Sequence, residues 1–107
     1  MKISKFHKIV NDIMLKIEDK IDHCVEIQNI DCEINNDVLT ITFSENKKIV
    51  INKQEKLQEL WMATEKNGYH FSKKQKQWIC NRSGKEFWSL LEKICFNTLK
   101  KQINFRS

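Results

Sequence analysis

The spacing of apolar residues changes twice along this 107-residue chain, and this change constrains its fold more than any other feature. From residue 3 to residue 21, apolar side chains recur every three or four positions, which is the period of a helix with one buried face. From residue 30 to residue 80 they recur in short runs at every second position, as in strands with one buried face. After residue 83 the helical period returns. The chain is therefore predicted to fold in the order helix, strands, helix.

About six antiparallel strands are predicted in the middle of the chain, separated by short polar turns. The runs lie at residues 30–34, 38–43, 48–52, 57–64, 69–71 and 78–80. The motif Ser83-Gly84-Lys85-Glu86 has the form of a capping box, which predicts that the second helix opens there. The expected fold is α+β, a two-layer α-β sandwich with the N- and C-terminal helices packed on one face of the sheet. Residues 1–107 are expected to form a single domain.

The net charge of +5 raises the question of a nucleic-acid partner. Of the 19 basic residues only Arg82 and Arg106 are arginines, although arginine reads bases and phosphates best. Lys, Ile and Asn are abundant and share codons rich in A and T, so genome composition can account for the charge. A nucleic-acid partner is therefore not expected. A lysine-rich nucleic-acid-binding module remains an alternative, and it would use Lys47, Lys48, Lys73, Lys74 and Lys76.

Enzymatic and structural-metal motifs are missing from the sequence. The chain has two glycines and no Gly-rich phosphate loop, nucleophile elbow or H-E-x-x-H motif. The spacing of Cys24, Cys32, Cys80 and Cys95 fits no structural zinc site, which indicates free thiols in a reducing compartment. No targeting or membrane-spanning segment is visible from Met1 onward. We expect a cytoplasmic, non-catalytic protein without an organic cofactor and without a membrane partner.

Six carboxylates fall within residues 17–33, against the single Lys20. The set, called the acidic ridge here, is Glu18, Asp19, Asp22, Glu26, Asp31 and Glu33. Glu18 and Asp22 are one helical turn apart, and Asp31 and Glu33 share one face of a strand at a spacing of roughly 7 Å. If the helix end and the strand lie side by side, the carboxylates on them come close together and repel one another. A row of carboxylates of this kind favours weak binding of a hard cation such as Fe(II), Fe(III), Ca(II) or Mn(II). A solvated helix end is the alternative.

Trp61 is a second candidate site residue. If Leu60 and Met62 point into the core, alternation places Trp61 on the outer surface of the sheet, near Asn52. An exposed tryptophan among small polar groups is typical of an interface anchor. A shifted register would bury Trp61 in the core instead, and the sequence leaves both possibilities open. Trp78 and Trp88 have apolar neighbours and are expected to pack in the core.

The runs IDCEINNDVLTITF at residues 30–43, KIVINKQEKLQELWMATEKNGYHF at 48–71 and WICNRSGKEFWSLLEKI at 78–94 resemble the frataxin family, in its bacterial CyaY type. The resemblance covers nearly the whole chain. It implies the same sandwich fold and an iron-binding accessory role in iron–sulfur cluster assembly, with iron held weakly at exposed carboxylates. The implied partners are the cysteine desulfurase, whose sulfur delivery such proteins modulate, and the iron–sulfur scaffold protein. A monomer is expected.

The resemblance also implies which positions act. Five carboxylates of the acidic ridge match the family's acidic positions and are the implied iron ligands: Glu18, Asp19, Asp22, Asp31 and Glu33. Glu26 is expected to join them as a local substitute. The implied partner-binding residues are Asp22, Asp31, Glu33, Asn52, Gln54 and Trp61. Relatives usually carry more acids, whereas this chain has His23, Val25, Ile27 and Asn29 around Glu26, a basic turn at 72–77 and Lys56 where proline is common. A ferroxidase or iron-storing oligomer is the alternative within the same family.

Overall fold

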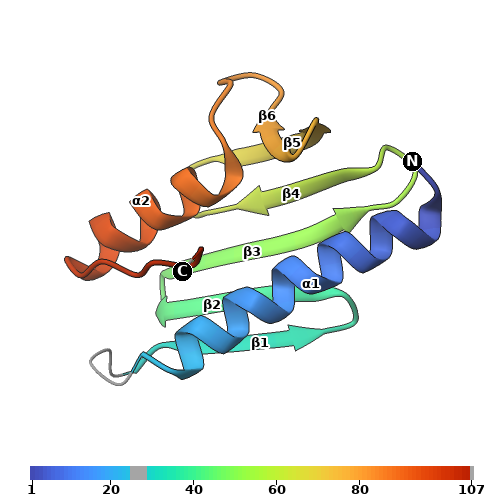
Figure 1. Cartoon of the computed structure of the whole chain (residues 1–107). Helices are drawn as coiled ribbons and strands as arrows, with labels where there is room; N and C mark the ends of the chain where they lie inside the picture. The colour runs from blue at the N-terminus through green and yellow to red at the C-terminus, as the bar shows by residue number, and fades with distance from the viewer. Residues whose placement is uncertain (25–28, 107) are drawn as a thin grey trace.

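The computed structural model describes residues 1–24 and 29–106. Two helices flank six strands along the chain (Figure 1). The elements are α1 (Ile3–Asp22), β1 (Asp31–Asn35), β2 (Val38–Ser44), β3 (Lys47–Gln54), β4 (Glu59–Ala63), β5 (Gly68–Lys74), β6 (Gln77–Cys80) and α2 (Phe87–Leu99). None of the described helices is long and apolar enough to cross a membrane.

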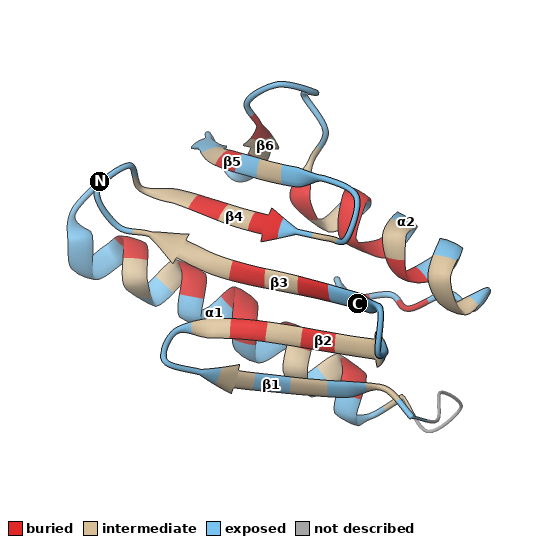
Figure 2. Ribbon diagram, turned by 180° about the vertical axis from the view of Figure 1, so that it is seen from behind, coloured by how far each residue is buried: buried red, intermediate tan, exposed pale blue. Residues whose placement is uncertain are grey.

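The six strands form one antiparallel sheet in which every strand pairs with its sequence neighbour, in the order β1-β2-β3-β4-β5-β6. Both helices cover the same face of this sheet (Figure 1), and the opposite face carries no helix (Figure 2). The predicted two-layer sandwich is confirmed. We call the helix-free side the outer face.

The core lies between the sheet and the two helices. α1 buries one stripe of side chains, because its apolar residues fall on one side of the helix. The stripe consists of Phe6, Val10, Ile13, Met14, Ile17 and Ile21. Ile3, which the same spacing placed in the stripe, is 49% exposed because the first helical turn lies at the open end of the sandwich (Figure 1). The rings of Phe71 and Phe87 meet edge to face at 5.3 Å between centroids and join the sheet to α2.

The start of α2 differs from the prediction. The helix begins at Phe87, and Glu86 is its N-cap, with its carboxylate accepting the N–H groups of Trp88 and Ser89 at 2.9 and 3.0 Å. The proposed capping box from Ser83 to Glu86 is wrong. Gly84 has a φ of 74°, in the left-handed region, so residues 83–86 cannot form the first helical turn.

The segment after α2 folds back into the core, which the sequence reading missed. Ile103 and Phe105 are buried, and the Phe105 ring packs beside Trp88 with 6.2 Å between centroids. The Glu92 carboxylate fixes this segment, because it accepts the Phe105 backbone N–H at 3.1 Å and an Arg106 guanidinium N–H at 2.7 Å. A buried carboxylate paired in this way avoids the cost of an isolated charge.

Lys53 links α1 to the sheet from the helix-facing side of β3. Its side chain is only 6% exposed. The ammonium group donates to His7 Nδ1 at 3.1 Å and to Asn11 Oδ1 at 3.0 Å, and lies 3.4 Å from the Asp37 carboxylate. The buried charge is therefore shared among several acceptors rather than left unpaired.

Candidate functional site

The acidic ridge forms at the edge of the sheet where the end of α1 lies beside β1. Glu18, Asp19 and Asp22 come from the last turns of α1, and Asp31 and Glu33 come from the edge strand, which contacts α1. Alternation along β1 turns Asp31 and Glu33 to the outer face, and both are exposed. The ridge therefore continues around the sheet edge from the helix layer to the outer face.

Cys32 of β1 lies beside the ridge carboxylates, and their charges affect its thiol. Its partial burial, together with the nearby charges of Glu18, Asp22 and Asp31, raises the pKa of the thiol to about 12. Three ridge carboxylates from two elements thus act on one side chain. The end of α1 and β1 therefore lie side by side, which is the condition for one continuous ridge.

Four of the five described ridge carboxylates have no ion-pair partner within the described residues. Asp19 contacts His23 at 3.2 Å, whereas no ion pair within 4 Å involves Glu18, Asp22, Asp31 or Glu33 in residues 1–24 and 29–106. In the same residues, no three side chains of His, Cys, Asp or Glu converge on a common metal position. Glu26, Val25 and Ile27 lie outside the described residues. The ridge is an open row of carboxylates rather than a cage.

Trp61 lies on the outer face of β4. Leu60 and Met62 on either side are buried in the core, so the register with Trp61 outward holds. The indole ring stacks flat on His70 of β5, with 3.9 Å between centroids and a 6° angle between the planes. The strand register brings the two rings together, because Trp61 pairs directly with His70.

A hydrogen-bond network holds the Trp61 ring from the other side. The indole N–H donates to Glu59 Oε1 at 2.8 Å, and the second oxygen of Glu59 accepts from Asn81 Nδ2 at 2.9 Å. Ser72 in turn donates to Asn81 Oδ1 at 2.8 Å. Stacking and hydrogen bonding together fix the ring, so its half-exposed face is presented in one orientation.

Asn52 and Gln54 lie on the same face of the neighbouring strand β3. Asn52 pairs with Trp61, and Gln54 pairs with Glu59. The side-chain oxygen of Asn52 is buried and has no hydrogen-bond partner in the described structure, which leaves one unsatisfied acceptor beside the indole. The predicted partner-binding residues of β3 and β4 therefore lie together around Trp61.

The supporting residues Glu59, His70 and Asn81 were missed in the sequence. Of these, His70 could have been found, since pairing the runs at 57–64 and 69–71 as a hairpin puts His70 opposite Trp61. Glu59 shares the outer face with Trp61 by alternation, but its hydrogen bond to the indole depends on side-chain conformation. Asn81 follows β6 in a turn, where no periodicity exists to place it.

The five lysines of the nucleic-acid alternative lie in two separate places. Lys47 and Lys48 begin β3, next to the end of β4 and the start of β5, whereas Lys73, Lys74 and Lys76 lie around the far end of β5. A seven-residue strand separates the two groups by roughly 20 Å. They do not form the single patch that this alternative needs.

A six-stranded meander covered by two helices, with an acidic edge that leads to an aromatic position on the outer face, defines a frataxin-like domain. Comparison with known proteins agrees, because the family described as a frataxin-like domain matches residues 1–101. The iron–sulfur cluster assembly protein CyaY of Buchnera aphidicola subsp. Baizongia pistaciae (strain Bp) is 45% identical over 105 residues, covering 98% of this chain and 89% of that protein. The chain belongs to the frataxin family, in its bacterial CyaY type.

Solved structures support the same assignment. Frataxin from Psychromonas ingrahamii matches with a TM-score of 0.89 and 33% identity, covering 100% of both chains. Trimeric frataxin from the yeast Saccharomyces cerevisiae, in a ferrous complex, matches with a TM-score of 0.75 and 22% identity over 86% of each chain. The yeast protein shares the fold with this chain. The resemblance seen in the sequence is confirmed.

Proposed function

We propose that this protein is a cytoplasmic, non-catalytic accessory protein of iron–sulfur cluster assembly. It binds the cysteine desulfurase through the acidic ridge and the outer face around Trp61, and it acts as a monomer that also meets the iron–sulfur scaffold protein. Iron is its cargo, held weakly by the ridge carboxylates before donation. The assembly role named for the Buchnera relative supports this proposal, and so does the ferrous complex of the yeast protein.

The observation that carries the proposal is that the strand part of the ridge and Trp61 share one continuous face. Glu33 pairs with Thr40 of β2, which pairs with Val50 of β3, which pairs with Ala63 of β4. Trp61 is two residues from Ala63 and points to the same side. Three strand spacings separate the carboxylate from the tryptophan strand, which is about 14 Å. One partner surface of ordinary size can cover both.

The two parts would contribute differently to binding. Uncompensated, exposed carboxylates steer a basic partner and raise the association rate, an effect that salt weakens. A half-buried tryptophan whose orientation is already fixed loses little conformational freedom on docking, so it can act as an energetic anchor. The charge on the ridge would then determine the association rate, and the Trp61 ring would determine the dissociation rate of the complex.

The test is a binding titration of the desulfurase with charge-reversed protein. Asp31→Lys combined with Glu33→Lys should weaken binding by at least about tenfold at low salt and flatten the dependence on salt. A matched control, Asp12→Lys combined with Glu55→Lys, makes the same charge change at exposed positions outside the ridge, in the middle of α1 and in the β3–β4 turn. If both double variants weaken binding equally, net charge alone explains the effect and the ridge is not the contact.

The Trp61 contact needs its own variant. Trp61→Ala should cost about 2 kcal/mol of binding, seen mainly as faster dissociation. Leu57→Ala is the control, because Leu57 is a large exposed side chain in the β3–β4 turn rather than on the outer face. An unchanged dissociation rate for Trp61→Ala, in a protein with a wild-type circular dichroism spectrum, would remove Trp61 from the interface.

Iron binding can be tested apart from the partner. Because the ridge carboxylates repel one another, anaerobic Fe(II) at millimolar concentration should raise the melting temperature by binding the native state. Glu18→Gln combined with Asp22→Asn should remove most of that rise, whereas Glu55→Gln combined with Asp12→Asn should keep it. No rise in the unchanged protein would mean that the carboxylates are merely solvated and that iron is not held here.

A further inference from the structure

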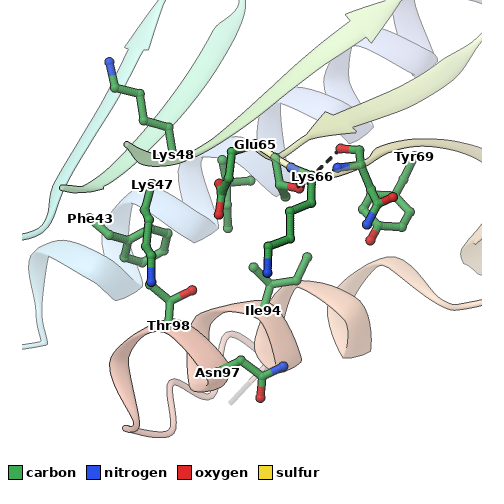
Figure 3. Close-up of a pocket in the computed structure, with 12 residues that line it drawn as sticks. Phe43, Lys47, Lys48, Glu65, Lys66, Tyr69, Ile94, Asn97 and Thr98 are labelled. Carbon is green, nitrogen blue, oxygen red and sulfur yellow. Dashed lines mark hydrogen bonds between the residues drawn. The ribbon is translucent and has the colours of Figure 1, made fainter. Parts of the chain in front are cut away.

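A hollow of about 240 Å³ opens at the end of the sandwich, away from the Trp61 face and separate from the acidic ridge. Its walls are the β2–β3 turn, the β4–β5 turn and the last turns of α2 (Figure 3). Pockets for drug-sized molecules measure roughly 300–1,000 Å³, so this hollow suits a smaller ligand. Its chemistry is basic, unlike that of the ridge.

Lys47 reaches into the hollow because of its place in β3. Alternation turns Lys47 and the buried Ile49 toward the helix layer and turns Lys48 toward the outer face. Figure 3 shows the result: the Lys47 ammonium lies beside Thr98 of α2, whereas the Lys48 side chain points away from the hollow. Neither lysine has an ion-pair partner within 4 Å among residues 1–24 and 29–106.

Lys66 approaches from the facing turn, which is held in one conformation. The Thr64 hydroxyl accepts the backbone N–H groups of Lys66 and Asn67 at 3.2 and 3.1 Å, and the Thr64 N–H donates back to the Asn67 carbonyl at 2.8 Å. This closed turn directs the Lys66 side chain toward Ile94 of α2 (Figure 3). Two ammonium groups, one from the start of β3 and one from the β4–β5 turn, therefore face one space.

The remaining lining supplies hydrogen bonds and an apolar floor. Asn97 and Thr98 of α2 offer an amide and a hydroxyl, and Tyr69 of β5 adds its ring and its phenol. Glu65 is the one acidic side chain in the lining, against the two lysines that point inward, Lys47 and Lys66, so the hollow is net positive. Phe43 and Ile94 close the bottom and exclude water from one side, which strengthens charge interactions there.

We propose that this hollow binds a small polyanion whose two oxyanion groups bridge Lys47 and Lys66. A short di- or tricarboxylate and a compact phosphate compound share this chemistry. The groups of Asn97 and Thr98 would bond to the same oxygens, and the carbon skeleton would rest on Phe43 and Ile94. The site is independent of the docking surface proposed above, since it uses none of its residues.

A purely structural role for Lys47 must be separated from ligand binding. The last turn of α2 has no basic residue of its own, so Lys47 can stabilise the free carbonyl groups at this helix end. If Lys47 has that structural role, the Lys47→Gln variant should melt at a lower temperature than the unchanged protein in buffer without added anion. The structural role would not change the response to an added anion. The two roles are therefore distinguished by measuring anion response and stability in the same variant.

The experiment is an NMR titration of ¹⁵N-labelled protein at constant ionic strength. Malonate and citrate form one arm, inorganic phosphate and pyrophosphate form the other, and chloride is the reference. We expect saturable shifts of the amides of Lys47, Lys66, Asn97 and Thr98, and the arm with the lower dissociation constant identifies the ligand class. Lys47→Gln and Lys66→Gln should each weaken binding about fivefold or more, and Glu65→Gln should strengthen it.

Lys48→Gln is the matched control, because it removes the same charge from the adjacent residue, whose side chain points out of the hollow (Figure 3). Binding that survives Lys48→Gln and is lost in Lys47→Gln supports the site. Equal weakening by both variants, or shifts that spread to Lys73 and Lys76, would show non-specific screening and overturn it. Linear, non-saturating shifts in both arms would overturn it as well.

Discussion

Removing the ring of Phe105 should destabilise the protein by about 3–5 kcal/mol, although this residue lies outside every helix and strand. Phe105 is fully buried, packs beside Trp88, and holds its segment in the groove where Glu92 accepts its backbone N–H. Phe105→Ala leaves a cavity of ring size, because the close-packed core around it can collapse only partly onto the vacated space. Small domains have only about 5–15 kcal/mol of stability, so the loss is a large fraction of the total.

Urea unfolding followed by tryptophan fluorescence and circular dichroism measures this loss directly, with an unchanged m-value expected. Phe96→Ala is the matched control, since it removes the same ring from α2 at a position that is 44% exposed, and it should cost less than about 1 kcal/mol. If the two variants lose the same small amount, the segment after α2 is not part of the cooperative core, and the reasoning fails. A lower m-value for Phe105→Ala would instead indicate that the segment detaches before the rest unfolds.

Two further predictions concern glycine and cysteine. An added Cβ at Gly68 or Gly84 meets no atom within 4 Å, but of the two only Gly84 has a left-handed φ. Gly84→Ala should therefore lower the free energy of unfolding by about 1 kcal/mol, whereas Gly68→Ala should raise it by about 0.5 kcal/mol, as measured by urea unfolding. Equal effects would contradict this. Burial, with nearby Glu92 adding to it, raises the pKa of the Cys95 thiol to about 12. The native state thus keeps a proton that the unfolded chain loses above about pH 8.5, so stability falls from pH 9 to 11, and Cys95→Ala should make that fall in melting temperature shallower. An identical pH profile would refute the assignment.

The sequence predicted the architecture because most elements bury one face only. Helical spacing put the apolar residues at every third or fourth position of α1 on one face, and hydrophobic burial turns that face to the sheet. Alternation put Leu60 and Met62 on one face of β4 and Trp61 on the other, but only the packed structure decides that Leu60 and Met62 are the buried pair. The capping-box prediction failed because a Ser-x-x-Glu motif does not say which of its ends opens the helix. Here the two oxygens of Glu86 cap two amides on their own, and Gly84 diverts the chain before them.

The candidate site was predictable only in part, since it depends on contacts between side chains that are distant in sequence. Clustering of acids along residues 17–33 indicated the ridge, and topology then brought β1 beside α1. The Glu59–Asn81 network and the basic hollow carry no periodic signal. The outward position of Lys48 and the inward position of Lys47 follow from alternation, but only the packing of α2 against the β4–β5 turn creates the space that Lys47 enters.

The order of elements also determines when the protein can complete its fold during synthesis. Each strand after the first finds its partner in the strand just made, so the sheet can assemble as the chain emerges. The apolar stripe of α1 has to wait for β1 to β3, a delay of roughly 2–6 seconds at ordinary translation rates. The core closes only when Phe105 has arrived. Nascent chains that stall before that residue would leave the part of the core that Ile103 and Phe105 cover exposed to solvent, and exposed apolar surface is what chaperones recognise.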